Sequence, residues 1–509
     1  MLLRRCILLA ALIYLDLVSA ATIQKRGSLI PVPTPATPRT WKDRVRAVFF
    51  GRSEQPLQKK KEQTNRRHNP LSHYVHDIVL RFNISGPSEA AAMSDAINTL
   101  YLDVWSATSS HVDIRMPRGT VPLLLDVLPE SMRNAHAPLV QSLADAALET
   151  YPGGVESPLP HAPQAMLQPT TGERSDILFF QDYQPLNVIV AWMKLLESLF
   201  PSHVELLTIG QSFEGRKIHA LKVGREKSSG KKKKAIVITG AAHAREWISV
   251  STVCYLAYAM ITGFSRDDKG IDTMVKEFDW IFLPTLNVDG YVYTWEQDRL
   301  WRKNRQPTSL AFCKGIDLDR AYNYHFDAPS VSSYNPCSDM FPGGYPFQAQ
   351  ESREFANWAD SLIKNGTKIV SLLDMHSYSQ EILYPYSYSC EAHPPDLENL
   401  EELAMGLAKA IRIQSGEHYE VTSACEGTGF AGLPGTTGGG SMLDYFYAKM
   451  KVHYPFQIKL RDTGSHGFLL PKENIVPTGA EMFNLLKYLS QFLLDDGSPT
   501  AVIKPSDEL

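Results

Sequence analysis

Apolar residues recur at two different spacings along this chain of 509 residues, and the spacing changes from segment to segment. Ile78, Leu80 and Phe82 alternate along one run, and residues 111–116 alternate in the same way, which predicts two strands. Residues 88–105 and 121–132 have the spacing expected of helices. Together these elements predict a small α+β module over residues 71–150.

The longer part of the chain, residues 178–495, predicts a single α/β domain. Residues 188–199 place their apolar side chains on one face of a helix, which the following Phe-Pro step should end. Short apolar runs at 236–239, 280–283 and 369–373 predict buried strands, and a loop rich in functional side chains follows each run. This arrangement is typical of a mostly parallel sheet with its site at the strand ends.

The amino-terminal 70 residues do not continue these patterns. Residues 1–20 combine a basic start, a short apolar run and small residues before Ala20, which predicts a signal peptide too short to span a bilayer. Residues 21–70 form a basic, proline-rich leader with dibasic pairs, and a precursor segment that proteases cut is the expected role. We therefore expect a secreted or vacuolar protein of the secretory pathway without a membrane anchor.

Two further segments are expected to lie outside the folded parts. Residues 151–177 are rich in Pro, Gly and polar side chains, and we interpret them as a linker and processing zone. Residues 496–509 form a tail ending in Ser-Asp-Glu-Leu, which resembles the retention signal of the endoplasmic reticulum but lacks its basic first residue. Retention there is the alternative to export or vacuolar delivery.

The net charge of −4 hides an asymmetry. The first 70 residues carry a net charge of +10 and all later residues together a net charge of −14. Because the basic excess belongs to the signal and leader, we expect no nucleic-acid partner. The expected molecule is a monomer with a protein or peptide ligand of unknown identity.

Five cysteines remain once Cys6 leaves with the signal peptide. The pairs Cys313–Cys337 and Cys390–Cys425 each bracket a loop, and we predict these two disulfides, although spacing alone does not fix the connectivity. Cys254 lies in an apolar run and is expected to be a buried free thiol. Asn83 and Asn365 begin sequons and are candidate glycosylation sites.

Candidate metal ligands follow two of the predicted strands. His243 and Glu246 come soon after the run at 236–239, and His376 comes just after the run at 369–373. Two imidazoles and one carboxylate suit zinc, and a set of three leaves a fourth position open for water, as in catalytic zinc sites.

Six short motifs surround these ligands in a fixed order. They are H-A-R-E-W at 243–247, R-L-W-R-K at 299–303, D-L-D-R at 317–320, H-S-Y-S at 376–379, L-R-D-T-G at 460–464 and G-F-L-L-P at 467–471. In this order the chain resembles the M14 family of zinc carboxypeptidases over residues 178–495. Residues 76–151 resemble the activation propeptide of that family.

The resemblance implies a fold and a set of roles. It implies a mixed, mostly parallel sheet of the eight-stranded type flanked by helices, preceded by a small open-sandwich α+β domain. One zinc ion would bind His243, Glu246 and His376, and Asp317 would orient His243. Arg302 would polarise the scissile carbonyl and Arg320 would hold the terminal carboxylate of the substrate. The remaining groove would be lined by Arg299, Ser377 and Tyr378.

Three departures from the family pattern point away from catalysis. Lys459 stands where the family has its glutamate base, and an ammonium cannot accept a proton. Asp319 stands where the family has an asparagine that binds the terminal carboxylate. Residues 430–441 contain no tyrosine, although the family has a capping tyrosine in this loop.

The departures lead to one main hypothesis and two alternatives. The main hypothesis is a zinc-binding, catalytically inactive homologue that acts by binding, similar to the inactive metallocarboxypeptidase-like proteins of fungi that are associated with cell-wall organisation and biogenesis. The first alternative is an active carboxypeptidase with an atypical base and a preference for apolar C-terminal residues. The second is a metal-free structural protein.

Overall fold

The structure is a computed structural model. It describes residues 71–108, 110–152, 178–225, 234–266, 268–326, 335–427 and 438–495. The predicted signal peptide, the leader, the tail and nearly all of the predicted linker lie outside these ranges, as does most of the loop without a tyrosine.

A mixed sheet of eight strands forms the centre of the larger domain, which confirms the predicted architecture. The four strands in its middle run parallel to one another, and the next strand on each side pairs with them in antiparallel orientation. In sheet order the strands are β11 (Glu420–Ser423), β10 (Glu381–Tyr384), β12 (Tyr454–Leu460), β9 (Lys368–Ser377), β7 (Lys234–Gly240), β8 (Phe278–Leu283), β6 (Lys217–Val223) and β5 (Val204–Gln211).

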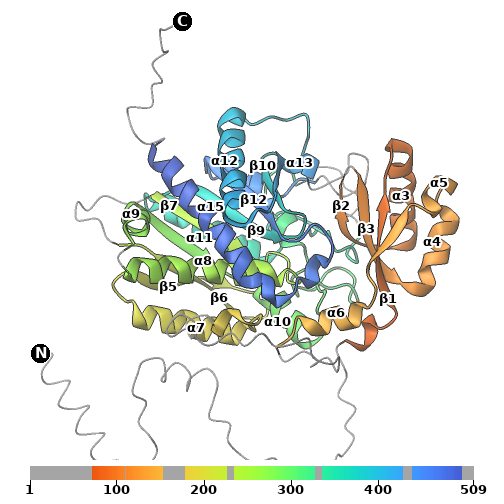
Figure 1. Ribbon diagram of the computed structural model, residues 1–509, viewed down its shortest axis with the longest axis horizontal. Coiled ribbons are helices and arrows are strands. Elements are labelled where there is room, and N and C mark those ends of the chain that lie inside the picture. The colour runs from red at the N-terminus through yellow and green to blue at the C-terminus, as the bar shows by residue number, and fades with distance from the viewer. Residues whose placement is uncertain are drawn as a thin grey trace, which may run out of the picture. The chain divides into compact units, whose positions relative to one another are not determined.

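Helices cover both faces of this sheet. On one face α8 and α15 lie side by side, and α12 packs beside α15 (Figure 1). The opposite face buries an apolar core under α11 and α14. The helices of the domain are α7 (Leu186–Leu199), α8 (Trp247–Ser265), α9 (Lys269–Glu277), α10 (Val288–Glu296), α11 (Gln350–Lys364), α12 (Leu397–Ser415), α13 (Ala424–Gly427), α14 (Met442–Ala448) and α15 (Ile475–Asp495).

Among the described residues one helix, α8, is long and apolar enough to cross a membrane. Its buried side chains lie on every side of the helix, and it packs against β7, β8 and β9. Its composition is therefore explained by its place in the core.

The smaller module is a four-stranded antiparallel sheet with helices on one face. Its strands, in sheet order, are β2 (Asp103–Ala107), β3 (His111–Pro117), β1 (Asp77–Asn83) and β4 (His136–Val140). Its helices are α3 (Pro87–Leu100), α4 (Val121–Val127), α5 (Glu130–Arg133) and α6 (Leu143–Glu149). Short 3-10 helices elsewhere are Ser72–Tyr74, Arg118–Thr120, Leu178–Phe180, Leu318–Arg320, Gly467–Leu469 and Lys472–Asn474.

Two helix predictions in the module were wrong at their ends. The helix predicted over 88–105 ends at Leu100, because Tyr101 has a left-handed backbone with φ of 53°, and Trp105 belongs to β2. The helix predicted over 121–132 is split at Leu128 and Pro129, where the proline has no amide hydrogen to continue the helical bonds.

The second face of the module packs on the larger domain, with which it forms one compact unit. Val79, Trp105 and Leu143 share a buried apolar cluster with Tyr378 and Phe468. The module therefore covers two of the loops that carry the sequence motifs.

Candidate metal centre

Parallel strands bring the three predicted ligands to one edge of the sheet. His243 follows β7, and Glu246 immediately precedes α8. His376 is the penultimate residue of β9, so the strand is longer than the apolar run at 369–373 suggested. Because β7 and β9 are parallel neighbours, their carboxyl ends meet at the same edge.

The ligand atoms of this triad converge on one point. His243 Nδ1 lies 2.9 Å from Glu246 Oε1, and His376 Nδ1 lies 3.1 Å from Glu246 Oε2. The two Nδ1 atoms are 3.0 Å apart. All three side chains are buried, with exposed fractions of 4%, 1% and 3% for His243, Glu246 and His376.

A second layer of carboxylates fixes the orientation of both imidazoles. His243 Nε2 lies 3.0 Å from Asp317 Oδ1, and His376 Nε2 lies 2.8 Å from Asp374 Oδ2. The hydroxyl of Thr239 donates to the other oxygen of Asp374 at 2.6 Å. With each Nε2–H donating to a carboxylate, both Nδ1 atoms present lone pairs to each other and to Glu246.

Three acceptors that face one another can bind a cation between them, and zinc fits this donor set. Bound there, zinc would supply a Lewis acid with one open position. Burial would lower the pKa of His376, but Asp374 and Glu246 outweigh it and raise that pKa well above its ordinary value. Burial would likewise raise the pKa of Glu246, yet His243 and His376 hold it well below the usual range. The two shifts have one cause in common, the attraction between the Glu246 carboxylate and the His376 imidazole.

Asp374 was not predicted from the sequence. It stands two residues before His376 in β9, and alternate residues of a strand share a face. That spacing was the available signal, and it could have identified Asp374 as the partner of His376.

The two arginines with predicted substrate roles share the carboxylate of Asp317. Arg302 Nη2 donates to Asp317 Oδ2 at 2.9 Å, and Arg320 Nε lies 3.5 Å from the same oxygen. Both side chains are partly exposed, with exposed fractions of 16% and 14%. The structure therefore places two cations beside the triad.

A small cavity of about 20 Å³ adjoins Arg320. Asp319 lines it and accepts hydrogen bonds from the Met442 amide at 3.1 Å and from Gln457 Nε2 at 2.8 Å. Burial raises the pKa of Asp319. Its lining residues are Asp319, Arg320, Ser387, Ala424, Gly438, Ser441, Leu443 and Gln457.

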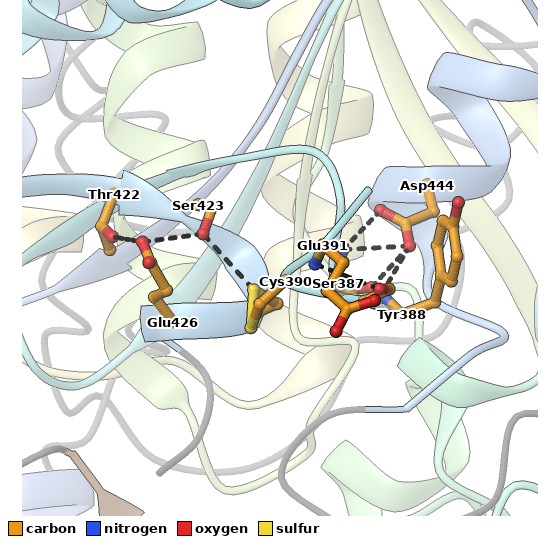
Figure 2. Close-up of a disulfide and its surroundings, with 10 residues drawn as sticks. Ser387, Tyr388, Cys390, Glu391, Thr422, Ser423, Glu426 and Asp444 are labelled. Atoms are coloured by element: carbon orange, nitrogen blue, oxygen red, sulfur yellow. Dashed lines mark hydrogen bonds between the residues drawn. A yellow bond between two sulfur atoms is a disulfide. The ribbon is translucent and has the colours of Figure 1, made fainter. Parts of the chain in front are cut away.

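Asp444 is hydrogen-bonded to Ser387, one of the residues that line this cavity (Figure 2). Its carboxylate accepts from the amides of Ser387 and Tyr388 at 2.9 and 3.1 Å and from the Ser387 hydroxyl at 2.8 Å. Burial raises the pKa of Asp444 to about 6, although these bonds oppose the shift.

Both predicted disulfides are confirmed. Cys390 and Cys425 join the chain after β10 to α13, with their Cα atoms 5.3 Å apart (Figure 2). Cys313 and Cys337 are also paired, with a Cα separation of 4.8 Å. Cys254 is a buried free thiol, as its apolar surroundings predicted.

The module contacts two residues expected to line the groove. Arg299 is fully buried, and its guanidinium stacks 3.7 Å from the centre of the Trp247 ring. It donates hydrogen bonds to Thr150 Oγ1 and to the Phe468 carbonyl, both at 3.0 Å. The Tyr378 hydroxyl donates to Asp113 at 2.7 Å. Thr150 and Asp113 belong to the module, so neither Arg299 nor Tyr378 faces an open groove here.

Ser377 and the two sequon asparagines are the remaining predicted residues. The amide of Ser377 donates to Glu246 Oε2 at 3.2 Å, which supports the triad. Asn83 and Asn365 are exposed, at the end of β1 and directly after α11. Their glycosylation stays a prediction.

Lys459 lies on β12 in direct register with His376 on β9 and with Glu381 on β10. Its ammonium is 2.8 Å from Glu381 Oε2 and donates to the Gly427 carbonyl at 3.1 Å. Glu381 was not predicted from the sequence, because its role depends on the register between β10 and β12.

Comparisons with known proteins agree with this geometry. The family model described as zinc carboxypeptidase matches residues 189–485. The "Inactive metallocarboxypeptidase ecm14" of Sclerotinia sclerotiorum is 50% identical over 445 residues, covering 84% of this chain and 74% of that protein. The "Inactive metallocarboxypeptidase ECM14" of Uncinocarpus reesii is 44% identical over 504 residues, covering 95% and 86%.

Solved structures show the same fold. The crystal structure of thrombin activatable fibrinolysis inhibitor superimposes with a TM-score of 0.69 at 27% identity, covering 83% of this chain and 100% of that chain. The matched region of the family model contains His243, Glu246 and His376, and it extends over most of the large domain. The chain belongs to the zinc carboxypeptidase family.

Proposed function

We propose that this protein is a zinc-binding, catalytically inactive metallocarboxypeptidase homologue that acts by binding a protein or peptide ligand. The names of its relatives in Sclerotinia sclerotiorum and Uncinocarpus reesii support the loss of activity. The family assignment and the converging donor atoms of the triad support one bound zinc ion.

The observation that carries the proposal is the ion pair of Lys459 with Glu381. Hydrolysis at a zinc site needs a group that takes a proton from the metal-bound water. Lys459 holds the position where the family resemblance places this base, and its ammonium forms an ion pair with Glu381 and donates to the Gly427 carbonyl. Three carboxylates beside the triad do not replace this base. Asp317 and Asp374 accept hydrogen bonds from the imidazoles, and Glu246 is itself one of the proposed zinc ligands.

The cellular role is proposed from the expected compartment and from the resemblance to the inactive fungal homologues. The predicted signal peptide, the exposed sequons and the two disulfides fit an oxidising compartment, so we propose a location outside the cell or in the vacuole. Cell-wall organisation and biogenesis is the process we propose, from the resemblance to the inactive fungal homologues.

The proposal is tested on the purified full chain, before and after limited proteolysis within residues 153–177. We expect about one zinc ion per chain by elemental analysis, and no release of C-terminal residues from a peptide panel in either sample. An active carboxypeptidase in the same assay is the positive control. Turnover at ordinary enzymatic rates of about 1 s⁻¹ or more would contradict the proposal. If Lys459→Ala then abolished that turnover, the atypical base would be identified.

A further inference from the structure

Three neighbouring strands place Glu381, Lys459 and His376 in one row. Lys459 on β12 is directly opposite Glu381 on β10 and directly opposite His376 on β9. Residues that are paired across strands project from the same face of the sheet, and adjacent strands are about 4.8 Å apart. The flexible stem of Lys459 could therefore direct its ammonium either toward the metal triad or toward Glu381.

The structure shows the ammonium on the Glu381 side. Nζ lies 2.8 Å from Glu381 Oε2 and donates to the Gly427 carbonyl at 3.1 Å. The side chains of Lys459 and Glu381 have exposed fractions of only 17% and 7%. A charge removed from water to this extent is costly unless it is paired, so the pair is held in place by the burial of both partners.

Gly427, the last residue of α13, accepts a hydrogen bond from Lys459 and so connects α13 to the ion pair. A Cβ atom built on this glycine would lie 2.4 Å from Leu383 Cδ2 and 3.0 Å from Thr422 Cγ2. Only glycine therefore lets the end of α13 approach β10 closely enough for its carbonyl to accept from Lys459. The disulfide between Cys390 and Cys425 ties the same short helix to the chain after β10.

We propose that Glu381 is a positioning residue that holds the Lys459 ammonium away from the metal triad, so that a cation next to His376 does not oppose metal binding. Without this carboxylate the ammonium would be free to approach His376. Its repulsion would then weaken the binding of a divalent ion. The inference rests on the proposed zinc binding for its metal readout, and the ion pair itself can be tested without zinc.

The geometry also predicts the result of restoring a carboxylate at position 459. Lys459→Glu would place that carboxylate directly opposite Glu381, and like charges at opposed positions of a sheet destabilise each other. We expect this single substitution to produce neither a stable fold nor an available base. Combining it with Glu381→Gln removes the repulsion.

The test measures zinc affinity of the full chain by competition with a chelator. Glu381→Gln is expected to weaken zinc binding about tenfold, because a free ammonium about 6 Å from a dication repels it even in a well-solvated site. Adding Lys459→Met to Glu381→Gln should restore the affinity to within about twofold of the original chain. Glu398→Gln is the matched control, since Glu398 is exposed in α12, and it should change nothing.

Each outcome decides the inference. Unchanged zinc affinity in Glu381→Gln, or no rescue by the added Lys459→Met, would overturn it. If Glu381→Gln does not fold, recovery of folding by Lys459→Met would support the pair, and no recovery would overturn it. If the original chain binds no zinc, the proposed function fails, while non-additive effects of Glu381→Gln and Lys459→Met on the unfolding midpoint still test the pair.

Discussion

The metal triad and the adjoining pocket lie side by side, yet they differ in how their charges are arranged. In the triad, three acceptor atoms face one another and the donors point outward to Asp317 and Asp374. In the pocket, Asp319 is bonded to Gln457 and Asp444 to Ser387. The triad thus offers its acceptor atoms to a cation from outside, whereas Asp319 and Asp444 have hydrogen-bond donors within the protein.

The difference follows from the elements that build each part. The triad comes from the ends of β7 and β9 and the start of α8, in the parallel middle of the sheet. The pocket comes from the 3-10 helix Leu318–Arg320, from α13, α14 and β12, and from the chain after β10. Because none of the elements that line the pocket carries a ligand of the triad, substitutions in the pocket can abolish substrate chemistry while the metal ligands keep their geometry.

The largest expected effect is on metal binding. Glu246→Gln removes the carboxylate ligand and should lower zinc affinity on the order of a thousandfold, measured by chelator competition. Gln is nearly the same size, so the loss should not come from packing. A loss of less than tenfold would show that the ion binds elsewhere, for example at Asp319, Asp374 and His376, whose candidate ligand atoms also lie within 4.8 Å of one another.

The next effect concerns the dependence of stability on pH. Burial raises the pKa of Asp444 from 3.8 to about 6, so the folded state holds this proton more tightly than the unfolded state does. Protonated Asp444 therefore contributes to the free energy of unfolding. That contribution is fully present below pH 4 and is lost as the pH rises through 6. Relative to Asp444→Asn, the original chain should lose up to about 3 kcal/mol of unfolding free energy between pH 4 and pH 7.

Denaturant unfolding of both proteins at several pH values measures this difference. Glu398→Gln serves as the control for an exposed carboxylate. A constant difference between the original chain and Asp444→Asn across the range would mean that Asp444 ionises normally, as a solvated group would.

The smallest effect concerns the internal pairing of the pocket. Gln457→Ala removes the donor that satisfies Asp319 Oδ2, and a buried acceptor without its partner costs about 1–2 kcal/mol. The zinc affinity should stay within about twofold of that of the original chain. Among the described residues, no hydrogen bond joins the Gln457 side chain to a ligand of the triad. A large loss of zinc affinity would show that triad and pocket are coupled.

The sequence predicted those features that depend on local pattern. The runs at 236–239, 280–283 and 369–373 lie within β7, β8 and β9, and the helix predicted at 188–199 lies within α7. The three candidate ligands could be named because zinc favours their residue types and because the motifs around them resemble those of the zinc carboxypeptidases. The two disulfides were predicted from the loops they bracket, and the structure supplied the connectivity that the spacing alone left open.

The features that the sequence did not reveal depend on long-range register or on contact between domains. Glu381 faces Lys459 only because β12 pairs with β10 in antiparallel register. Arg299 is buried because Thr150, from the module, meets it across the interface. Neither contact leaves a periodic signal, since the partners are separated by many residues.

The order of strands in the large sheet has a consequence for how the chain is made. β9 and β10 follow each other in sequence, but β12, which is formed much later in the chain, lies between them. While a ribosome is still synthesising the chain, both neighbours of β12 have an open edge, and open edges invite pairing with other chains. Nascent or truncated molecules that end before residue 454 should therefore aggregate readily and depend on chaperones until the last strand is inserted.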